Sequence, residues 1–253
     1  MSLCLAIISL AFAILSGCAG PAVQRDFTPV SLPTVQAGDR WQYRINDAYN
    51  GNPVGTLRVQ IEETGPEHIV ARETERDGDG DAGVRRTFTR EWNPESGRMP
   101  AGLPLAPFTH GIESGTALKY APAYPALRFP LARGKRWNER ILATDPATQK
   151  RVAIRVRARV VGSERIKVPA GEFDAIKVRR EVFYEDGEWW RSPTEALETD
   201  WYAPEINAVV QRYTESQFWD YSSGSNNGGA DLRLGDRRVI ELESYSRASP
   251  GRP

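Results

Sequence analysis

The sequence predicts an all-β protein built mainly from an antiparallel sheet. Apolar and polar residues alternate in several stretches, beginning with the run from Trp41 to Asn46, and a period of two is typical of strands with one buried face. Turn-forming segments such as Asn50–Pro53 and Gly65–Pro66 separate these stretches, as expected for hairpins. No stretch shows sustained helical periodicity, which argues against the helical fold classes.

The predicted strands follow one another along the chain. They cover residues 41–46, 57–62, 68–76, 84–92, 136–144, 151–161, 173–184, 189–202, 209–217 and 239–245. Between two of them, Val168–Phe173 (Val-Pro-Ala-Gly-Glu-Phe) predicts a hairpin turn, because Pro169 fixes φ and Gly171 permits positive φ. Residues 222–229 are rich in Ser, Asn and Gly and predict a loop.

A proline-rich segment, residues 93–130, interrupts this pattern. It contains seven prolines and many large apolar side chains. Long structureless segments inside a compact domain are often lids or binding loops, and the apolar side chains favour packing onto something apolar. A surface excursion without a role is the alternative that remains open.

A short internal repeat flanks this segment. Residues 38–45 (Gly-Asp-Arg-Trp-Gln-Tyr-Arg-Ile) match residues 134–141 (Gly-Lys-Arg-Trp-Asn-Glu-Arg-Ile) at five of eight positions. Both copies begin a run of long strands, which predicts two similar half-sheets. Chance convergence of two strand beginnings is the alternative.

The amino-terminal residues predict export and lipid attachment. The run from Met1 to Leu15 is apolar and uncharged, too short for a spanning helix, and ends in small residues, as a secretory signal does. Its ending, Leu15–Cys18 (Leu-Ser-Gly-Cys), resembles the bacterial lipobox, which implies cleavage before Cys18 and acylation of its thiol. Ala19 resembles the sorting signal for the outer rather than the inner membrane. The run lacks a preceding positive charge, so a natural start upstream of Met1 stays open.

The predicted organisation is therefore a signal peptide (1–17), a lipidated tether (18–36), one β-rich domain (37–247) with the proline-rich segment as a lid or loop, and a tail (248–253).

Composition limits the chemistry. The 33 basic and 33 acidic residues balance, which disfavours nucleic acid as a partner. The two cysteines are Cys4 and Cys18, so the mature chain has no thiol for a disulfide or a thiolate metal site. With only His68 and His110 and no nucleophile or zinc motif, we expect no catalytic residue, metal or cofactor.

Several segments resemble a diffuse group of uncharacterised bacterial periplasmic and lipoprotein β domains. They are residues 38–41, 129–131, 134–137, 168–173 with Lys177 and Val178, and 201–204. The Val-Pro-Ala-Gly-x-Phe turn is the most distinctive. Members of the group are similar to the lipoprotein-carrier fold, which implies a curved sheet or half-barrel around an apolar cavity beneath a lid. No catalytic residues come with this resemblance.

Two sets of side chains are candidates for binding. An apolar ligand would contact Trp41, Trp137, Trp189, Trp201, Phe108 and Tyr124, each of which would serve equally well as a core residue. An anion would contact the arginines on one face of residues 150–161, which are Arg151, Arg155, Arg157 and Arg159. Cross-strand ion pairing is the alternative for these arginines. The Asp77–Asp81 run lacks the remaining features of a calcium loop and predicts a hairpin tip.

Three functions remain after these exclusions. The first is a non-enzymatic envelope lipoprotein that faces the periplasm and binds an apolar small molecule or a partner protein. The second is an assembly or scaffold lipoprotein without a ligand cavity. The third, favoured least, is a hydrolase of cell-wall or lipid material that would use His110 or a carboxylate pair.

Overall fold

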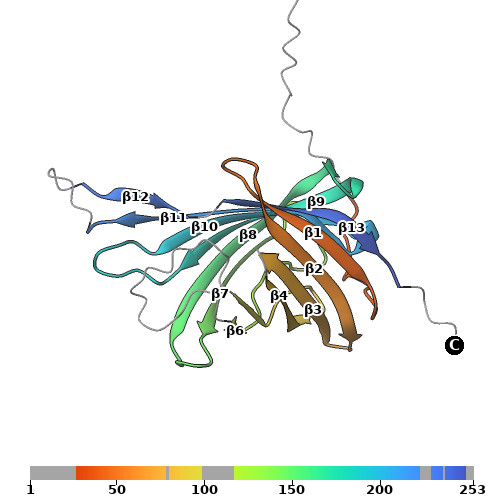
Figure 1. Ribbon diagram of the computed structural model, residues 1–253, viewed down its shortest axis with the longest axis horizontal. Coiled ribbons are helices and arrows are strands. Elements are labelled where there is room, and N and C mark those ends of the chain that lie inside the picture. Colours follow the sequence, from red (N-terminus) through yellow and green to blue (C-terminus); the bar gives the residue numbers. More distant parts are fainter. Residues whose placement is uncertain (1–26, 78–79, 99–116, 223–228, 236, 249–253) are drawn as a thin grey trace, which may run out of the picture.

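The computed structural model describes residues 27–77, 80–98, 117–222, 229–235 and 237–248, almost all of them in antiparallel strands (Figure 1). The strands are β1 (Arg40–Asp47), β2 (Pro53–Thr64), β3 (His68–Asp77), β4 (Gly80–Thr89), β5 (Ser96–Arg98), β6 (Ala117–Ala121), β7 (Arg136–Thr144), β8 (Arg151–Val168), β9 (Gly171–Tyr184), β10 (Thr194–Ala203), β11 (Ala208–Asp220), β12 (Asp231–Leu234) and β13 (Arg238–Ser246). A 3-10 turn, η1 (Pro204–Ile206), precedes β11.

All of these strands belong to one 13-stranded sheet. Its order is β4-β3-β2-β1-β13-β11-β10-β9-β8-β7-β6-β5, and β12 pairs with the far part of β11. The chain thus runs from the middle of the sheet to one edge, crosses to the other edge and returns to the middle. The all-β, antiparallel fold class predicted from the sequence is confirmed.

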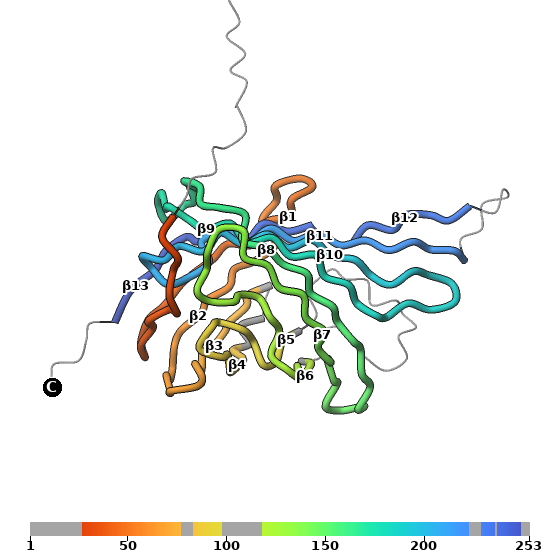
Figure 2. Tube along the Cα trace, turned by 180° about the vertical axis from the view of Figure 1, so that it is seen from behind, coloured from red at the N-terminus to blue at the C-terminus, as the bar shows by residue number. Residues whose placement is uncertain are grey.

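The sheet is so strongly curved that its two edges meet (Figures 1 and 2). Phe88 of β4 forms an isolated bridge with Pro94, just before β5. The Glu95 N–H also donates a hydrogen bond to the Thr87 carbonyl at 3.0 Å. These contacts close the sheet almost into a barrel, with a concave inner face and a convex outer face.

The inner face carries the hydrophobic core in two clusters. One lies mainly on β7–β10 and the other mainly on β1–β4 with parts of β9–β11 and β13. The last part of the proline-rich segment packs into the first cluster, where Leu127 is buried, as is Leu131 just after the segment. The Asn93 side chain holds Leu127 through hydrogen bonds to its backbone N–H and carbonyl, at 2.8 and 2.9 Å. Residues 99–116 of this segment lie outside the described residues.

Part of the segment assigned to the tether packs against the sheet. Val30 and Leu131 exchange backbone hydrogen bonds at 2.9 and 2.8 Å, and Val35 is buried in the second cluster. The structure therefore places residues 27–36 with the domain. Phe27 follows Cys18 by nine residues, which span at most about 30 Å when fully extended.

The internal repeat has the same backbone geometry in both copies. Gly38 and Gly134 have φ of 92° and 77°, and their N–H groups donate to the carbonyls of Ile61 and Val160 at 2.9 and 3.0 Å. Ile61 and Val160 each return a 2.9 Å hydrogen bond to the residue after the glycine. A β-bulge follows Ile61 in the β2–β3 pair and Val160 in the β8–β9 pair. The two half-sheets share this arrangement.

Two predicted strands are shorter than expected for local reasons. The strand predicted over 84–92 ends at Thr89, because Trp92 adopts a positive φ of 62° that breaks the pairing. The strand predicted over 189–202 begins only at Thr194. Residues 185–193 instead form a loop around a buried ion pair between Arg191 and Asp186, 2.8 Å apart.

Candidate functional site

Four charged side chains alternate in sign across the inner face of β9, β10 and β11. Arg180 lies in β9, Glu198 and Asp200 in β10, and Arg212 in β11. The Asp200 carboxylate accepts two hydrogen bonds from Arg212, at 2.6 and 2.9 Å, and lies 2.9 Å from the Arg180 guanidinium. Arg180 also donates to Glu198 at 2.7 Å. These residues, the inner charge cluster, form one continuous network.

Burial and pairing both act on this cluster. The side chains of Arg180 and Asp200 are 0% exposed. Burial alone would raise the pKa of Asp200, but Arg180 and Arg212 outweigh it and hold that pKa below its ordinary range. Burial would lower the pKa of Arg212, and Asp200 outweighs that in turn. Asp200 and Arg212 are therefore both ionised at neutral pH.

The end of the proline-rich segment completes the cluster from within the curved sheet. The Tyr124 hydroxyl donates to Glu198 at 2.9 Å, and Arg180 donates to the Ala126 carbonyl at 3.0 Å. One buried Arg180 nitrogen, Nη2, and the buried Tyr184 hydroxyl have no hydrogen-bond partner in the described part of the chain. Buried polar atoms are normally satisfied, so these two atoms are available to a water or a ligand.

Arg212 is the accessible end of the cluster. Its side chain is 39% exposed, although Asp200 beneath it is fully buried. Tyr43 lies in β1, two strands away from β11 in the sheet, and Glu73 lies in β3. Burial raises the pKa of Tyr43, the Arg212 charge opposes this rise, and the charges of Asp200 and Glu73 add to it. Strands from both halves of the sheet therefore direct polar groups toward the same interior region.

This arrangement fits binding better than acid–base catalysis. A carboxylate such as Asp200, with a lowered pKa and two guanidinium partners, is a poor proton acceptor at neutral pH. A guanidinium fixed by a buried carboxylate, with its outer side accessible, is well suited to hold an anionic or hydrogen-bond-accepting group. Within the described residues, no group of His, Cys, Asp or Glu side chains could hold a metal ion.

Three of the predicted ligand contacts lie on the inner face as packed residues. Trp41 is only 1% exposed and belongs to the second core cluster. Trp137 packs against the first cluster and donates its indole N–H to the Pro125 carbonyl at 2.9 Å. Tyr124 is buried beside Glu198. Of the three, Tyr124 contacts the inner charge cluster directly.

Among the described residues, the other two candidates make no hydrogen bond or cation–π contact with the inner charge cluster. Trp201 is half-buried and packs against the second core cluster, and its side chain alternates with that of Asp200; its indole N–H donates to Glu164, and the Lys177 ammonium lies 4.8 Å from its ring centre. Trp189 is 88% exposed in the loop between β9 and β10. The structure therefore does not bring the predicted aromatic residues into one site. Phe108 lies outside the described residues.

Trp189 belongs to a group of exposed apolar side chains at one end of the molecule. The β11–β12 hairpin projects beyond the rest of the sheet (Figure 1), and the β9–β10 loop is fixed to it by a 2.7 Å hydrogen bond from Tyr221 N–H to the Trp190 carbonyl. The exposed apolar residues on these two segments, the arm patch, are Trp189, Trp219, Tyr221, Leu232 and Leu234.

The predicted arginine row lies on the outer face of β8, exposed at all four positions, which are Arg151, Arg155, Arg157 and Arg159. Arg155 lies 3.7 Å from Glu185, and the Arg157 guanidinium lies 5.1 Å from the centre of the Phe183 ring. Arg159 is in register with Arg136 on one side and Arg179 on the other. An ion pair with Glu185 and a ring contact with Phe183 thus account for Arg155 and Arg157. At the end of the row, Arg136, Arg159 and Arg179 lie side by side on three neighbouring strands.

Several predicted features cannot be placed. Cys18 and His110 lie outside the described residues, as do the side chains of the Asp77–Asp81 run. No helix in the ranges that the structure describes is long and apolar enough to cross a bilayer.

The inner charge cluster was missed by sequence reasoning, although a signal for it exists. Arg180 lies between Val178 and Val182 on the apolar face of a strand, where an alternating pattern requires an apolar residue. Asp200 breaks the pattern of β10 in the same way, two residues before the buried Tyr202. Charges on an apolar face of two neighbouring strands indicate a buried ion pair.

Comparisons with known proteins give no match in sequence, since neither a protein-family model nor a curated protein matches the chain. Among solved structures, the chain is similar to one described as a candidate exported protein with a YmcC-like fold from Bacteroides fragilis, with 17% identity and a TM-score of 0.49 over 87% of this chain and 100% of that one. A candidate lipoprotein from Parabacteroides distasonis gives 14% identity and a TM-score of 0.49 over the same shares. The hypothetical lipoprotein YmcC of Escherichia coli gives 11% and 0.37, over 85% and 86%.

Proposed function

We propose that this protein is a lipoprotein of the bacterial envelope, anchored through acylated Cys18, whose curved sheet binds an amphipathic ligand at the membrane surface. The observation that carries the ligand part is the accessible Arg212 guanidinium, fixed by a fully buried Asp200 inside the curved sheet. Such a ligand would have an apolar part and a negatively charged or hydrogen-bond-accepting head. The head would bind Arg212 in the interior, and the anchor at Cys18 would hold the protein where such ligands are found.

The position of the packed chain supports the anchor. Phe27, the first described residue, packs against the first core cluster. With residues 18–26 as the tether, the domain would stay within about 30 Å of the lipid. Multiple acyl chains on one residue give stable attachment, whereas a single chain holds only marginally. We place the protein on the periplasmic side of the outer membrane in preference to the inner one, on the Ala19 signal.

The inner face supports an amphipathic ligand. Two apolar clusters cover most of that face, and the inner charge cluster lies among them with two unsatisfied polar atoms, Arg180 Nη2 and the Tyr184 hydroxyl. An anionic head on Arg212 would give a charge-assisted hydrogen bond, which is stronger than a neutral one. The apolar part of the ligand would contact the surrounding side chains.

Mass spectrometry of the full chain purified from its native membrane tests both parts. The account predicts an amino-terminal peptide that begins at Cys18 and carries acyl chains, together with a co-purified amphiphile in the organic extract. A Cys18→Ser variant serves as the control and is expected to leave the membrane fraction. An unmodified Cys18 in membrane-purified protein would overturn the anchor, and an extract free of amphiphile would overturn the ligand.

Partner binding by an assembly lipoprotein is the second candidate, and the arm patch favours it. Large apolar side chains gathered at a projecting end often mark an interaction site. Replacement of Trp189 distinguishes the two functions: loss of a cross-linked envelope partner with an unchanged lipid extract supports the scaffold function.

A further inference from the structure

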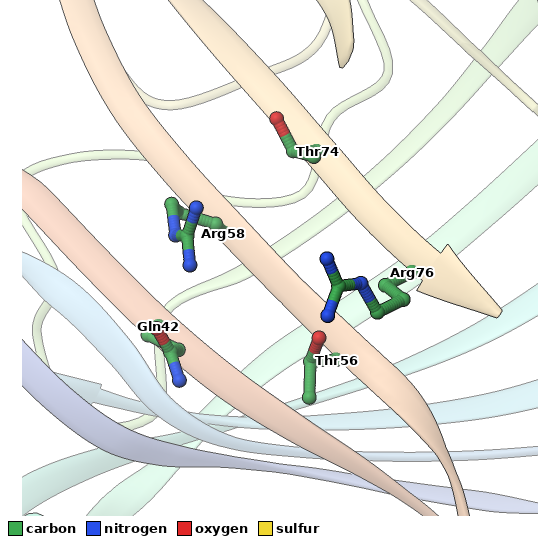
Figure 3. A pocket seen from close by; sticks show the side chains of 5 residues that line it. All are labelled: Gln42, Thr56, Arg58, Thr74 and Arg76. Carbon is green, nitrogen blue, oxygen red and sulfur yellow. The ribbon is translucent and has the colours of Figure 1, made fainter. Parts of the chain in front are cut away.

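A polar hollow lies on the outer face, on the opposite side of the sheet from the inner charge cluster. It has a volume of about 200 Å³ and is lined by Gln42 of β1, Thr56 and Arg58 of β2, and Thr74 and Arg76 of β3. Figure 3 shows the Thr56 hydroxyl and the Arg76 guanidinium turned toward one another, with Arg58 farther along β2 on the side of Gln42. A volume below the roughly 300–1,000 Å³ of drug-sized pockets suits a small ion or a head group.

The lining arises from the same three-residue pattern on two neighbouring strands. Residues 56–58 read Thr-Leu-Arg and residues 74–76 read Thr-Glu-Arg. Because β2 and β3 are antiparallel, Thr56 pairs with Arg76 and Arg58 pairs with Thr74. Each arginine is therefore paired across the strands with a threonine, and the four residues form a square with the two arginines on one diagonal.

The side chains that line this hollow are all either uncharged or positively charged. Arg72, on the same face of β3, lies 2.6 Å from Glu62, and Arg44 lies 2.6 Å from Glu241. No carboxylate lines the hollow, and Arg58 makes no ion pair with any residue of the described part. An anion in the hollow would give Arg58 a negatively charged partner.

The geometry points to an oxyanion site in this hollow, the Thr–Arg pocket, which takes a phosphate group. Two guanidiniums and two hydroxyls around a local two-fold arrangement supply donors for a tetrahedral anion from both sides. The phosphate comes either from a soluble phosphate ester or ion, or from the head group of a phospholipid. The pocket does not depend on the proposed ligand of the inner face, because the sheet separates the two.

Phosphate titration of the full chain in a sugar-headgroup detergent tests the pocket. The probe is inorganic phosphate, followed by calorimetry and by NMR of the arginine side chains. Arg58→Gln and Arg76→Gln are each expected to weaken phosphate binding about tenfold or more. Arg72→Gln, on the same strand face but outside the hollow, is the control and is expected to keep wild-type affinity. Equal affinity in all four proteins, or no binding by the wild type, overturns the site.

A vesicle experiment separates the two sources of phosphate. The same proteins are mixed with vesicles of phosphatidylglycerol and with vesicles of an uncharged glycolipid. Binding to phosphatidylglycerol that Arg58→Gln weakens and inorganic phosphate competes away assigns the pocket to head groups. Binding of inorganic phosphate that the vesicles do not affect assigns it to a soluble phosphate. Vesicle binding that is equal in wild type and Arg58→Gln counts against the head-group assignment.

Discussion

The Asp200 carboxylate binds the Arg212 guanidinium through two hydrogen bonds, of 2.6 and 2.9 Å, that join neighbouring strands on the inner face. Asp200 is buried, whereas Arg212 remains accessible. Burial of paired charges is weak evidence for stability by itself. The pair is better explained as a device that fixes an arginine in the interior of the sheet, where a perturbed and buried charge network indicates a functional site.

Loss of the carboxylate is expected to destabilise the fold strongly. Asp200→Asn leaves Arg212 without its counter-charge and Arg180 with Glu198 alone, and breaking a buried pair this way costs about 3–5 kcal/mol. Urea unfolding of the full chain in detergent measures this cost. Arg44→Gln, which removes a half-exposed pair with Glu241 on the outer face, is the matched control and should cost about 1 kcal/mol or less. Similar costs for both variants would contradict the burial argument.

The same residue predicts a dependence of stability on pH. The pKa of Asp200 is held below its ordinary value by Arg180 and Arg212, so the unfolded chain takes up a proton at this position first as the pH falls. The stabilisation is therefore fully present above the unfolded pKa of about 4 and is lost as the pH falls toward the folded pKa. Unfolding free energies between pH 6 and 2 should decline less steeply for Asp200→Asn than for the wild type. Parallel curves would show that Asp200 does not contribute.

The two copies of the repeat should respond unequally to the same substitution. Gly38 and Gly134 both have positive φ, so alanine at either position is strained by about 1–2 kcal/mol. A Cβ at Gly38 would also lie 3.1 Å from the Ala248 Cβ, whereas a Cβ at Gly134 meets nothing within 4 Å. Thermal unfolding should show a larger loss of Tm for Gly38→Ala than for Gly134→Ala. The reverse order would contradict the packing of residue 248 on this turn.

Trp189 should matter for interaction and not for stability. Its side chain is 88% exposed, so Trp189→Ser is expected to change the unfolding free energy by no more than about 0.5 kcal/mol. Arg191→Met, two residues away, leaves the buried Asp186 unpaired and should cost several kcal/mol. Cross-linking in envelope fractions then shows whether Trp189→Ser loses a partner. A large stability loss for Trp189→Ser would mean that its side chain is packed.

The positions of the strands were easier to predict from the sequence than the closure of the sheet into a near-barrel. Alternation gave the fold class, and the Val168–Phe173 segment gave the turn between β8 and β9, where Gly171 has a φ of 137°. The short strands β5, β6 and β12 were not predicted, because three to five residues are too few to show a period. The closure between Phe88 and Pro94 depends on the curvature of the whole sheet, which no local pattern records.

The candidate site could be predicted only in part. Alternation places Arg180 and Asp200 on apolar faces, but it does not align β9 with β10, and a one-residue change of register would separate the two charges. Trp41 illustrates a second limit. The sequence pattern places this aromatic residue on the inner face, but the pattern is the same for a core residue and for a ligand contact. The Thr–Arg pocket likewise depends on the register of β2 against β3.

Mass spectrometry of bound lipid in an Arg212 variant tests the proposed function most directly. Wild type, Arg212→Gln and the outer-face control Arg44→Gln are purified as full chains from the native membrane, checked for equal folding, and extracted with organic solvent. The account predicts an amphiphile with an anionic or hydrogen-bond-accepting head in wild type and Arg44→Gln, reduced about tenfold or more in Arg212→Gln. Equal amounts in all three proteins, or none in any of them, would contradict a ligand site at Arg212.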